Sequence, residues 1–253
     1  MSRMIAITID GKPIEVEERS TILQAAARVG VWIPSLCHHE AVSDLGACRT
    51  CIVEIERKGR RRIVTACNYP IEESIAIETA NEKVSAERRL IVELLLARSP
   101  NSPVIKELAT RLGVKGGRFE NEDERCILCG LCVRVCDEVM GRRAIDFVGR
   151  GVDERGDTPF GVQSDDCIGC GACASVCPAG IIFVDDSSGA RRIVRWHAEF
   201  DLEPCPECGK PVSTRRHIEY LREKMNITDC GQVLCEECKR RLHMEKAAVE
   251  GHM

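Results

Sequence analysis

The chain has 253 residues, 44% of them hydrophobic and 30% charged, which excludes a disordered tail and indicates ordinary folded domains. Its net charge of -4 argues against nucleic acid or an anionic membrane surface as the main partner. Aromatic residues make up only 4% of the chain while cysteine occurs 17 times, so we expect several small domains, each held together by something that the cysteines bind.

The cysteines indicate metal rather than disulfide bonds. Residues 1–9 lack the long apolar segment of a secretory signal, and the most apolar stretch, residues 90–97, is too short for a membrane span and is interrupted by Glu93. We therefore expect a cytoplasmic protein with reduced thiols. Most of the cysteines are separated by two residues, a spacing that suits a shared metal centre better than a disulfide bond.

Residues 1–80 have the order of elements of a β-grasp fold: a strand hairpin, a helix, a cysteine-containing loop and further strands. The hairpin turns at Asp10-Gly11. Thr21 and Gln24 predict a capping box at the start of the helix. The predicted elements are hairpin strands within residues 4–16, a helix at 22–29, and strands at 62–66 and 74–78.

Four cysteines of this first domain have the spacing C-x10-C-x2-C-x15-C, and they are Cys37, Cys48, Cys51 and Cys67. Three thiolates in one loop and a fourth after the next strand suit a rhombic [2Fe–2S] cluster. A single zinc ion is the alternative, and it fits less well because only one CxxC pair is present. A Rieske-type site with His38 and His39 would need paired Cys and His motifs, so we expect both histidines to face solvent beside the cluster.

Residues 81–123 contain no cysteine and predict a short helical linker. Apolar residues recur at helical spacing in residues 86–98, and a second short helix is expected at 104–112. Pro100 and Pro103 separate the two helices.

Residues 124–186 contain the strongest pattern, because the run C-x2-C-x2-C-x3-C occurs twice. This is the ferredoxin run of bacterial [4Fe–4S] proteins, in which the fourth cysteine of each run binds the cluster of the other run. One cluster is therefore expected on Cys126, Cys129, Cys132 and Cys177, and the second on Cys136, Cys167, Cys170 and Cys173. Two zinc sites are the alternative, but zinc usually uses paired CxxC motifs rather than three cysteines in tandem.

Residues 198–253 predict a zinc-ribbon-like module with a C-terminal helix at 242–249. Its two CxxC pairs, separated by 26 residues, are Cys205 with Cys208 and Cys235 with Cys238. A further iron–sulfur cluster that uses Cys230 is the alternative. Residues 214–224 between the pairs predict an amphipathic helix with a solvated basic face.

The motifs together resemble a known family. They are similar to the N-terminal part of the iron–sulfur large subunit of NADH dehydrogenases, and even more to the diaphorase iron–sulfur subunit of NAD-linked hydrogenases and formate dehydrogenases. The resemblance covers residues 4–185 and implies one [2Fe–2S] and two [4Fe–4S] clusters, and docking to a flavin-bearing, NADH-oxidising subunit. The matching stretches are SLCHH at 35–39, GACRTCIVE at 46–54, TAC at 65–67, ERCILCGLCVRVCDEV at 124–139 and GRG at 149–151.

One departure from the family concerns the segment after the long helix. The family often has a further cluster site there, with the pattern His-x3-Cys-x2-Cys-x5-Cys. Residues 97–106 instead read ARSPNSPVIK, without histidine or cysteine. We expect that cluster to be missing. Electrons would then pass between the remaining clusters without it, or through a cluster of a neighbouring subunit.

The predicted fold is α+β, with a β-grasp [2Fe–2S] domain, a helical linker, a bacterial two-cluster domain and the zinc-ribbon-like module. No glycine-rich nucleotide loop or nucleophile motif is visible. We expect an electron-transfer subunit without its own substrate site, in a cytoplasmic, hetero-oligomeric NAD(H)-linked oxidoreductase. It would connect the flavin-bearing subunit to another redox subunit or ferredoxin, and the resemblance suggests electron bifurcation as one setting. The alternatives are an iron–sulfur redox sensor with a zinc-ribbon contact module, or a scaffold with inert clusters.

Overall fold

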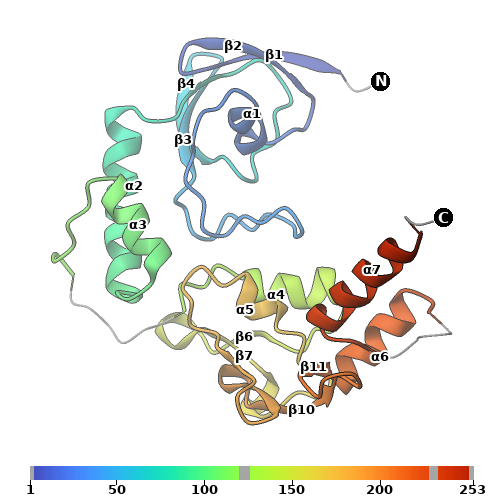
Figure 1. Cartoon of the computed structure of the whole chain (residues 1–253). Helices are drawn as coiled ribbons and strands as arrows, with labels where there is room; N and C mark the ends of the chain where they lie inside the picture. The colour runs from blue at the N-terminus through green and yellow to red at the C-terminus, as the bar shows by residue number, and fades with distance from the viewer. Residues whose placement is uncertain (1–2, 120–125, 228–232, 251–253) are drawn as a thin grey trace.

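The computed structural model describes residues 3–119, 126–227 and 233–250 of the chain (Figure 1). It combines helices with three β-sheets, as predicted for a mixed α and β protein. The N-terminal sheet with α1 forms one part, and the two cysteine runs and the C-terminal sheet form the other. Helices α2 and α3 lie side by side along one edge of the molecule. Among the described helices, none has both the length and the apolar character that crossing a membrane requires.

The N-terminal sheet has five strands in the order β2-β1-β5-β3-β4. Strands β1 and β5 are parallel, and the other neighbours are antiparallel. Helix α1 (Ile22–Arg28) buries one face against this sheet, because Ile22, Ala25 and Ala26 join the isoleucines of β1 in one core. The strands are β1 (Met4–Ile9), β2 (Lys12–Glu17), β3 (Ile52–Arg57), β4 (Arg60–Thr65) and β5 (Ala76–Glu78).

The predicted hairpin and helix cap are confirmed. Asp10 and Gly11 both have positive φ, as a two-residue hairpin turn requires, and Ile9 pairs with Lys12. The hydroxyl of Thr21 accepts a hydrogen bond from the Gln24 amide at 3.2 Å, and the Gln24 side chain accepts one from the Thr21 amide at 2.9 Å. Strand β3 was not predicted, although its run of buried Ile and Val residues after Cys51 is typical of a central strand.

Helices α2 (Glu82–Arg98) and α3 (Pro103–Arg111) form the predicted linker. Helix α2 begins four residues earlier than expected, because the Asn81 side chain caps it by accepting a hydrogen bond from the Val84 amide at 2.9 Å. The buried Arg88 attaches α2 to the N-terminal domain. It donates to the carbonyls of Thr50 and Thr79 at 3.0 Å each, and to that of Ile52.

Replacing Arg88 with leucine should destabilise the chain by about 3 kcal/mol, because three buried carbonyls would lose a charged donor. Urea unfolding followed by circular dichroism measures this loss. The variant Arg89→Leu, one position along the same helix at an exposed site, is the matched control and should stay within about 0.5 kcal/mol of the wild type. Equal stability of the two variants would show that Arg88 does not hold α2 in place.

The two cysteine runs lie on short elements and loops between residues 126 and 177. The first run continues from α4 (Leu131–Arg134) into a π-helical turn, η1 (Val135–Val139). The second run includes α5 (Ala172–Ser175). Between them are β6 (Asp146–Val148), the 3-10 turn η2 (Gly151–Asp153), β7 (Arg155–Asp157) and the 3-10 turn η3 (Pro159–Gly161).

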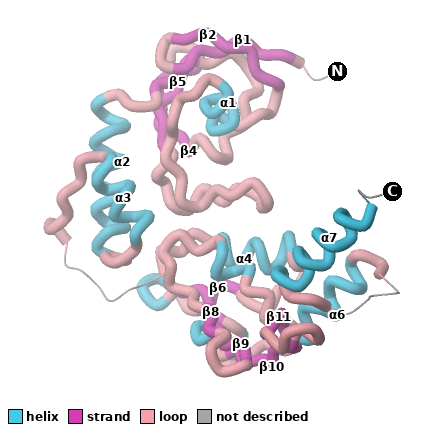
Figure 2. Tube along the Cα trace, viewed as in Figure 1, coloured by secondary structure: helices cyan, strands magenta, loops and turns pink. Residues whose placement is uncertain are grey.

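A second sheet follows the runs, with four strands in the order β11-β10-β9-β8 (Figure 2). The predicted helices are both present, α6 with Thr214 as its N-cap and α7 beginning before the expected residue 242. The elements are β8 (Val184–Asp185), β9 (Ala190–Ile193), the 3-10 turn η4 (Val194–Trp196), β10 (Ala198–Pro204), β11 (Pro211–Thr214), α6 (Arg215–Lys224) and α7 (Glu236–Glu250).

This C-terminal sheet packs on the second cysteine run. The hydroxyl of Thr214 donates to the Ile168 carbonyl at 2.5 Å. Gly169 has a φ of +66°, and a Cβ there would lie 2.7 Å from Phe200 and 2.8 Å from Thr214, so only glycine fits between the run and the sheet. The sheet spans residues 184–214 and so continues across the predicted boundary between the two C-terminal domains. The domain limits at residues 80, 123, 186 and 198 stay predictions.

Candidate metal centres

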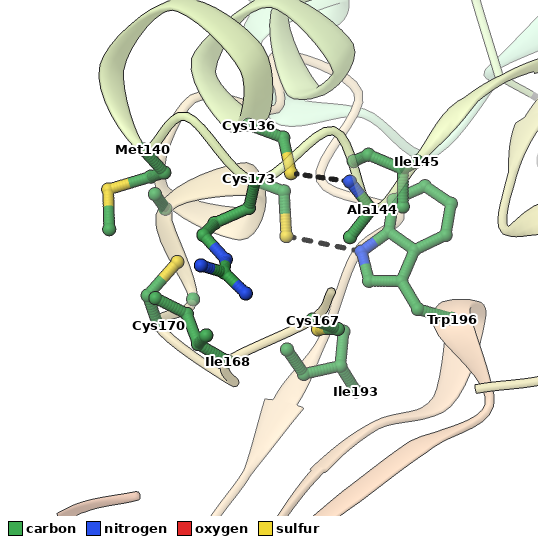
Figure 3. A pocket seen from close by; sticks show the side chains of 13 residues that line it. Cys136, Met140, Ala144, Ile145, Cys167, Ile168, Cys170, Cys173, Ile193 and Trp196 are labelled. Carbon is green, nitrogen blue, oxygen red and sulfur yellow. Dashed lines mark hydrogen bonds between the residues drawn. The ribbon is translucent and has the colours of Figure 1, made fainter. Parts of the chain in front are cut away.

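Two hollows in the C-terminal half are each lined by four cysteines. The first hollow contains three cysteines of the first run and the last cysteine of the second run, namely Cys126, Cys129, Cys132 and Cys177. The second hollow contains the complementary set, Cys136, Cys167, Cys170 and Cys173 (Figure 3). The structure therefore brings together the two sets that the crossed-ligand pattern predicts, although their binding of clusters stays a prediction.

The first run serves both hollows from one continuous helical segment, which passes from α4 into the π-helical turn η1. Cys132 lines the first hollow, and Cys136, four residues later, lines the second. The Met140 amide donates to the Val135 carbonyl, five residues back, at 3.0 Å, which makes the turn that contains Cys136 wider than an α-helical turn.

Hydrogen-bond donors point at the cysteine sulfurs in both hollows. The Leu128 amide donates to Cys126 Sγ at 3.3 Å, and the Ala144 amide donates to Cys136 Sγ at 3.4 Å. Cys173 Sγ accepts from a side chain, the indole N–H of Trp196, at 3.1 Å (Figure 3). Such donors suit negatively charged thiolates bound to iron, so the residues present fit [4Fe–4S] clusters.

Burial adds a second reason for metal at these sites. It raises the pKa of Cys129 and of Cys173 to about 12, because desolvation penalises the thiolate. A thiolate in either hollow therefore needs a nearby cation, which iron provides.

The four cysteines of the N-terminal domain are all buried. The Cys48 amide donates to Cys37 Sγ at 3.5 Å, and the Leu36 amide donates to Cys48 Sγ at the same distance. Contact with the thiols of Cys48 and Cys67 lowers the pKa of Cys37, and contact with Cys67 lowers that of Cys51. The four sulfurs thus form one connected group with amides directed at it, and they fit a [2Fe–2S] cluster.

The two neighbouring histidines lie outside this group of sulfurs. His39 is exposed, whereas His38 is half-buried and pairs with Asp44, with 2.7 Å between Nδ1 and Oδ1. We expected His38 to face solvent, but in the structure it pairs with the carboxylate of Asp44.

The [2Fe–2S] site and the first hollow are joined by one buried side chain, Arg134. Its Nη2 donates to the Cys37 carbonyl at 2.8 Å and to the Cys129 carbonyl at 3.1 Å, and its Nη1 donates to the Ser43 carbonyl. Cys37, Cys48 and Cys129 also belong to one hydrophobic core. The two sites are consequently in direct packing contact.

A second connection lies at the surface beside Arg134. The Glu138 carboxylate accepts from both the amide and the hydroxyl of Ser43, each at 2.6 Å. These two hydrogen bonds lower the pKa of Glu138 below its usual range. The connection thus adds to the attachment of the [2Fe–2S] loop to the first run.

The segment without the family's further cysteines contacts the first hollow. The Arg98 side chain donates to the Cys126 carbonyl at 2.5 Å, and the Ser102 hydroxyl donates to the Pro178 carbonyl at 2.9 Å. The linker therefore supports the first hollow at the place where the family often has a further cluster.

The two C-terminal cysteine pairs come together in one compact group of four sulfurs. The sulfurs of Cys205, Cys208, Cys235 and Cys238 all lie within 4.8 Å of one another. Among the described residues, no other group of three or more cysteine, histidine or acidic side chains is this compact. The Cys235 amide lowers the pKa of Cys205 to about 6 by donating to its sulfur at 3.4 Å. The arrangement fits a single metal ion, while the predicted role of Cys230 lies outside the described residues.

Comparisons with known proteins agree with these sites. Residues 2–82 match the model of a 2Fe-2S iron-sulfur cluster binding domain, and residues 125–181 and 160–214 match models of 4Fe-4S dicluster domains. One relative is the NADPH-Fe(3+) oxidoreductase subunit alpha of Geobacter sulfurreducens, 38% identical over 86% of this chain and 28% of its own length. Another is an NADH-quinone oxidoreductase subunit of Rhizobium meliloti, 32% identical over 81% of this chain and 27% of its own length.

A solved structure has a similar fold. A chain of the NAD+-reducing [NiFe]-hydrogenase in the H2-reduced state superposes with a TM-score of 0.55 at 24% identity, covering 83% of this chain and 92% of that chain. This chain spans less than a third of the length of each of the two curated relatives. It contains one 2Fe-2S iron–sulfur domain and a 4Fe-4S dicluster domain, and it is similar in these domains to subunits of NADPH- and NADH-linked oxidoreductases.

Proposed function

We propose that the chain relays electrons between a flavin-bearing, NADH-oxidising subunit and another redox subunit or ferredoxin, inside a cytoplasmic hetero-oligomeric complex. The observation that carries this proposal is the contact between successive cysteine sites. Arg134 joins the [2Fe–2S] site to the first hollow, and Trp196 lines both the first and the second hollow. When bound, such clusters accept and release single electrons.

The order of the sites supports a route that needs no cluster in the linker. Arg98 and Ser102 occupy the linker position with hydrogen bonds to the first hollow, while the [2Fe–2S] loop packs directly on that hollow. The chain would then present its [2Fe–2S] domain toward one partner and its second hollow toward the other. The names of the relatives, an NADPH-Fe(3+) oxidoreductase and an NADH-quinone oxidoreductase, support a pyridine nucleotide as the electron source or sink.

The test is reduction by NADH in the presence and absence of a flavin-bearing subunit. The chain is purified without air, and its iron signals are followed by EPR after addition of NADH alone, NADH with that subunit, or dithionite. Dithionite should reduce all the clusters, and NADH should do so only with the flavoprotein. Reduction by NADH alone, or iron that dithionite cannot reduce, would contradict the relay.

For the C-terminal cysteines we propose a structural zinc ion. A tetrahedral site with Zn–S bonds of about 2.3 Å has its sulfurs about 3.8 Å apart, which agrees with four sulfurs that all lie within 4.8 Å. The Lys210–Glu237 ion pair, with 2.6 Å between Nζ and Oε2, connects the two halves of the site at the surface. The site therefore joins β10 and β11 to helix α7.

A Cys235→Ser variant should lose one zinc per chain and keep its iron content of about ten per chain. Elemental analysis and the visible spectrum measure the two metals independently. The variant Lys210→Met is the matched control, since it removes the surface ion pair but no thiolate, and it should retain the zinc. A fall in iron rather than zinc in Cys235→Ser would favour a fourth iron–sulfur cluster.

A further inference from the structure

Trp196 is a side chain outside both cysteine runs that contacts both hollows. It ends the turn η4 and is only 1% exposed, which makes it the largest fully buried side chain of the described residues. Its ring belongs to the walls of the first and the second hollow, and Figure 3 shows it beside Cys173.

The two ends of the indole meet the two hollows differently. At one end, Nε1–H donates to Cys173 Sγ at 3.1 Å. The other end of the ring, at Cη2, lies near Cys132 of the first hollow. A Cβ built on Gly156 would be 3.8 Å from Trp196 Cη2 and also 3.8 Å from Cys132 Sγ. This end of the ring has no N–H and donates no hydrogen bond to Cys132. The hydrogen bond therefore acts on one hollow only.

Other polar groups also surround the two hollows. Backbone amides reach the sulfurs of Cys126 and Cys129 in the first hollow and those of Cys136 and Cys167 in the second. Arg195 lies on the wall of the first hollow, whereas Arg142, Arg191 and Arg216 lie near cysteines of the second. Among the described residues, Trp196 is the side-chain N–H donor directed at a sulfur in these hollows.

We propose that Trp196 raises the reduction potential of the [4Fe–4S] site formed by Cys136, Cys167, Cys170 and Cys173, and so favours its reduction over that of the other [4Fe–4S] site. Reduction adds one electron and one negative charge, and a donor N–H stabilises the more negative state. The bond is buried, and low polarity strengthens it. The proton stays on Nε1 and no bond is broken, and electron transfer toward the second hollow becomes more favourable. The inference rests on the proposed ligand sets.

The test is an EPR-monitored redox titration of the Trp196→Phe variant of the full chain. Phenylalanine keeps a buried ring but has no N–H. We expect about a tenfold smaller equilibrium constant for reducing the second cluster, which is about 59 mV for a one-electron couple. The first cluster and the [2Fe–2S] cluster should keep their potentials. Trp32→Phe, at the half-exposed second tryptophan, is the matched control and should change nothing.

Unchanged potentials in Trp196→Phe, or equal shifts of both [4Fe–4S] clusters, would overturn the inference. A measurement on the unaltered chain covers the case in which the variant does not assemble. With isotope-labelled indole nitrogen, pulsed EPR of the reduced protein should detect that nitrogen coupled to the second cluster, and no coupling would also overturn the inference. Missing iron signals in the wild type would instead contradict the proposed function, so the two failures are distinguishable.

Discussion

The Cys136→Ser variant should lose the cluster of the second hollow and keep the cluster formed by the other three cysteines of its own run. Cys136 lines the same hollow as Cys167, Cys170 and Cys173. A serine hydroxyl is a poor substitute for a thiolate, so iron should fall by about four per chain. Elemental analysis and EPR of the dithionite-reduced protein measure the loss.

The matched control is Cys177→Ser, which changes the reciprocal position in the second run. It should remove the cluster of the first hollow, where Cys177 lies beside Cys126, Cys129 and Cys132. The two variants together assign each EPR signal to its hollow. If each variant lost the cluster of its own run, the crossed assignment would be wrong.

The Arg134→Met variant should separate the [2Fe–2S] site from the first hollow. Methionine fills the space of the arginine stem but donates no hydrogen bond, so the carbonyls of Ser43, Cys37 and Cys129 lose their shared charged donor. Removing one partner from a buried charged network costs about 3–5 kcal/mol. We expect that loss in urea unfolding, together with weaker magnetic coupling between the reduced [2Fe–2S] and [4Fe–4S] clusters in EPR.

The control for Arg134 is Glu138→Gln, which weakens the exposed contact to Ser43 and leaves the buried one intact. This variant should lose about 1 kcal/mol or less and keep the coupling. Full coupling in Arg134→Met would show that packing alone holds the two sites together.

The cysteine spacing predicted more of the candidate sites than of the fold. A spacing of two residues confines three thiols to one turn, and the fourth thiol must come from elsewhere in the chain. The four cysteines that line each hollow could therefore be predicted without a structure. The Thr21 capping box and the Asp10-Gly11 turn could also be predicted, because each depends only on residues that are close in the sequence.

Residues that act over long distances in the chain were not predicted. Arg134 lies inside the first run and resembles an ordinary solvated charge, but its partners Ser43 and Cys37 lie 91 and 97 residues away. Trp196 is a lone aromatic residue without periodic neighbours. Strands β8, β9 and β11 have two to four residues each, too few for an alternating pattern to distinguish them. The apolar and charged residues of β10, AEFDLEP, do alternate, and this signal was missed.

The exchange of one cysteine between the two runs has a consequence for iron supply. A cluster bound in either hollow would hold both runs together, because each hollow takes cysteines from both. Binding of the first cluster therefore removes most of the entropic cost of organising the other hollow. The second filling is then easier than the first, which is positive cooperativity. A cell starved of iron would accordingly contain a bimodal population, with complete and empty copies of this domain and few half-filled ones.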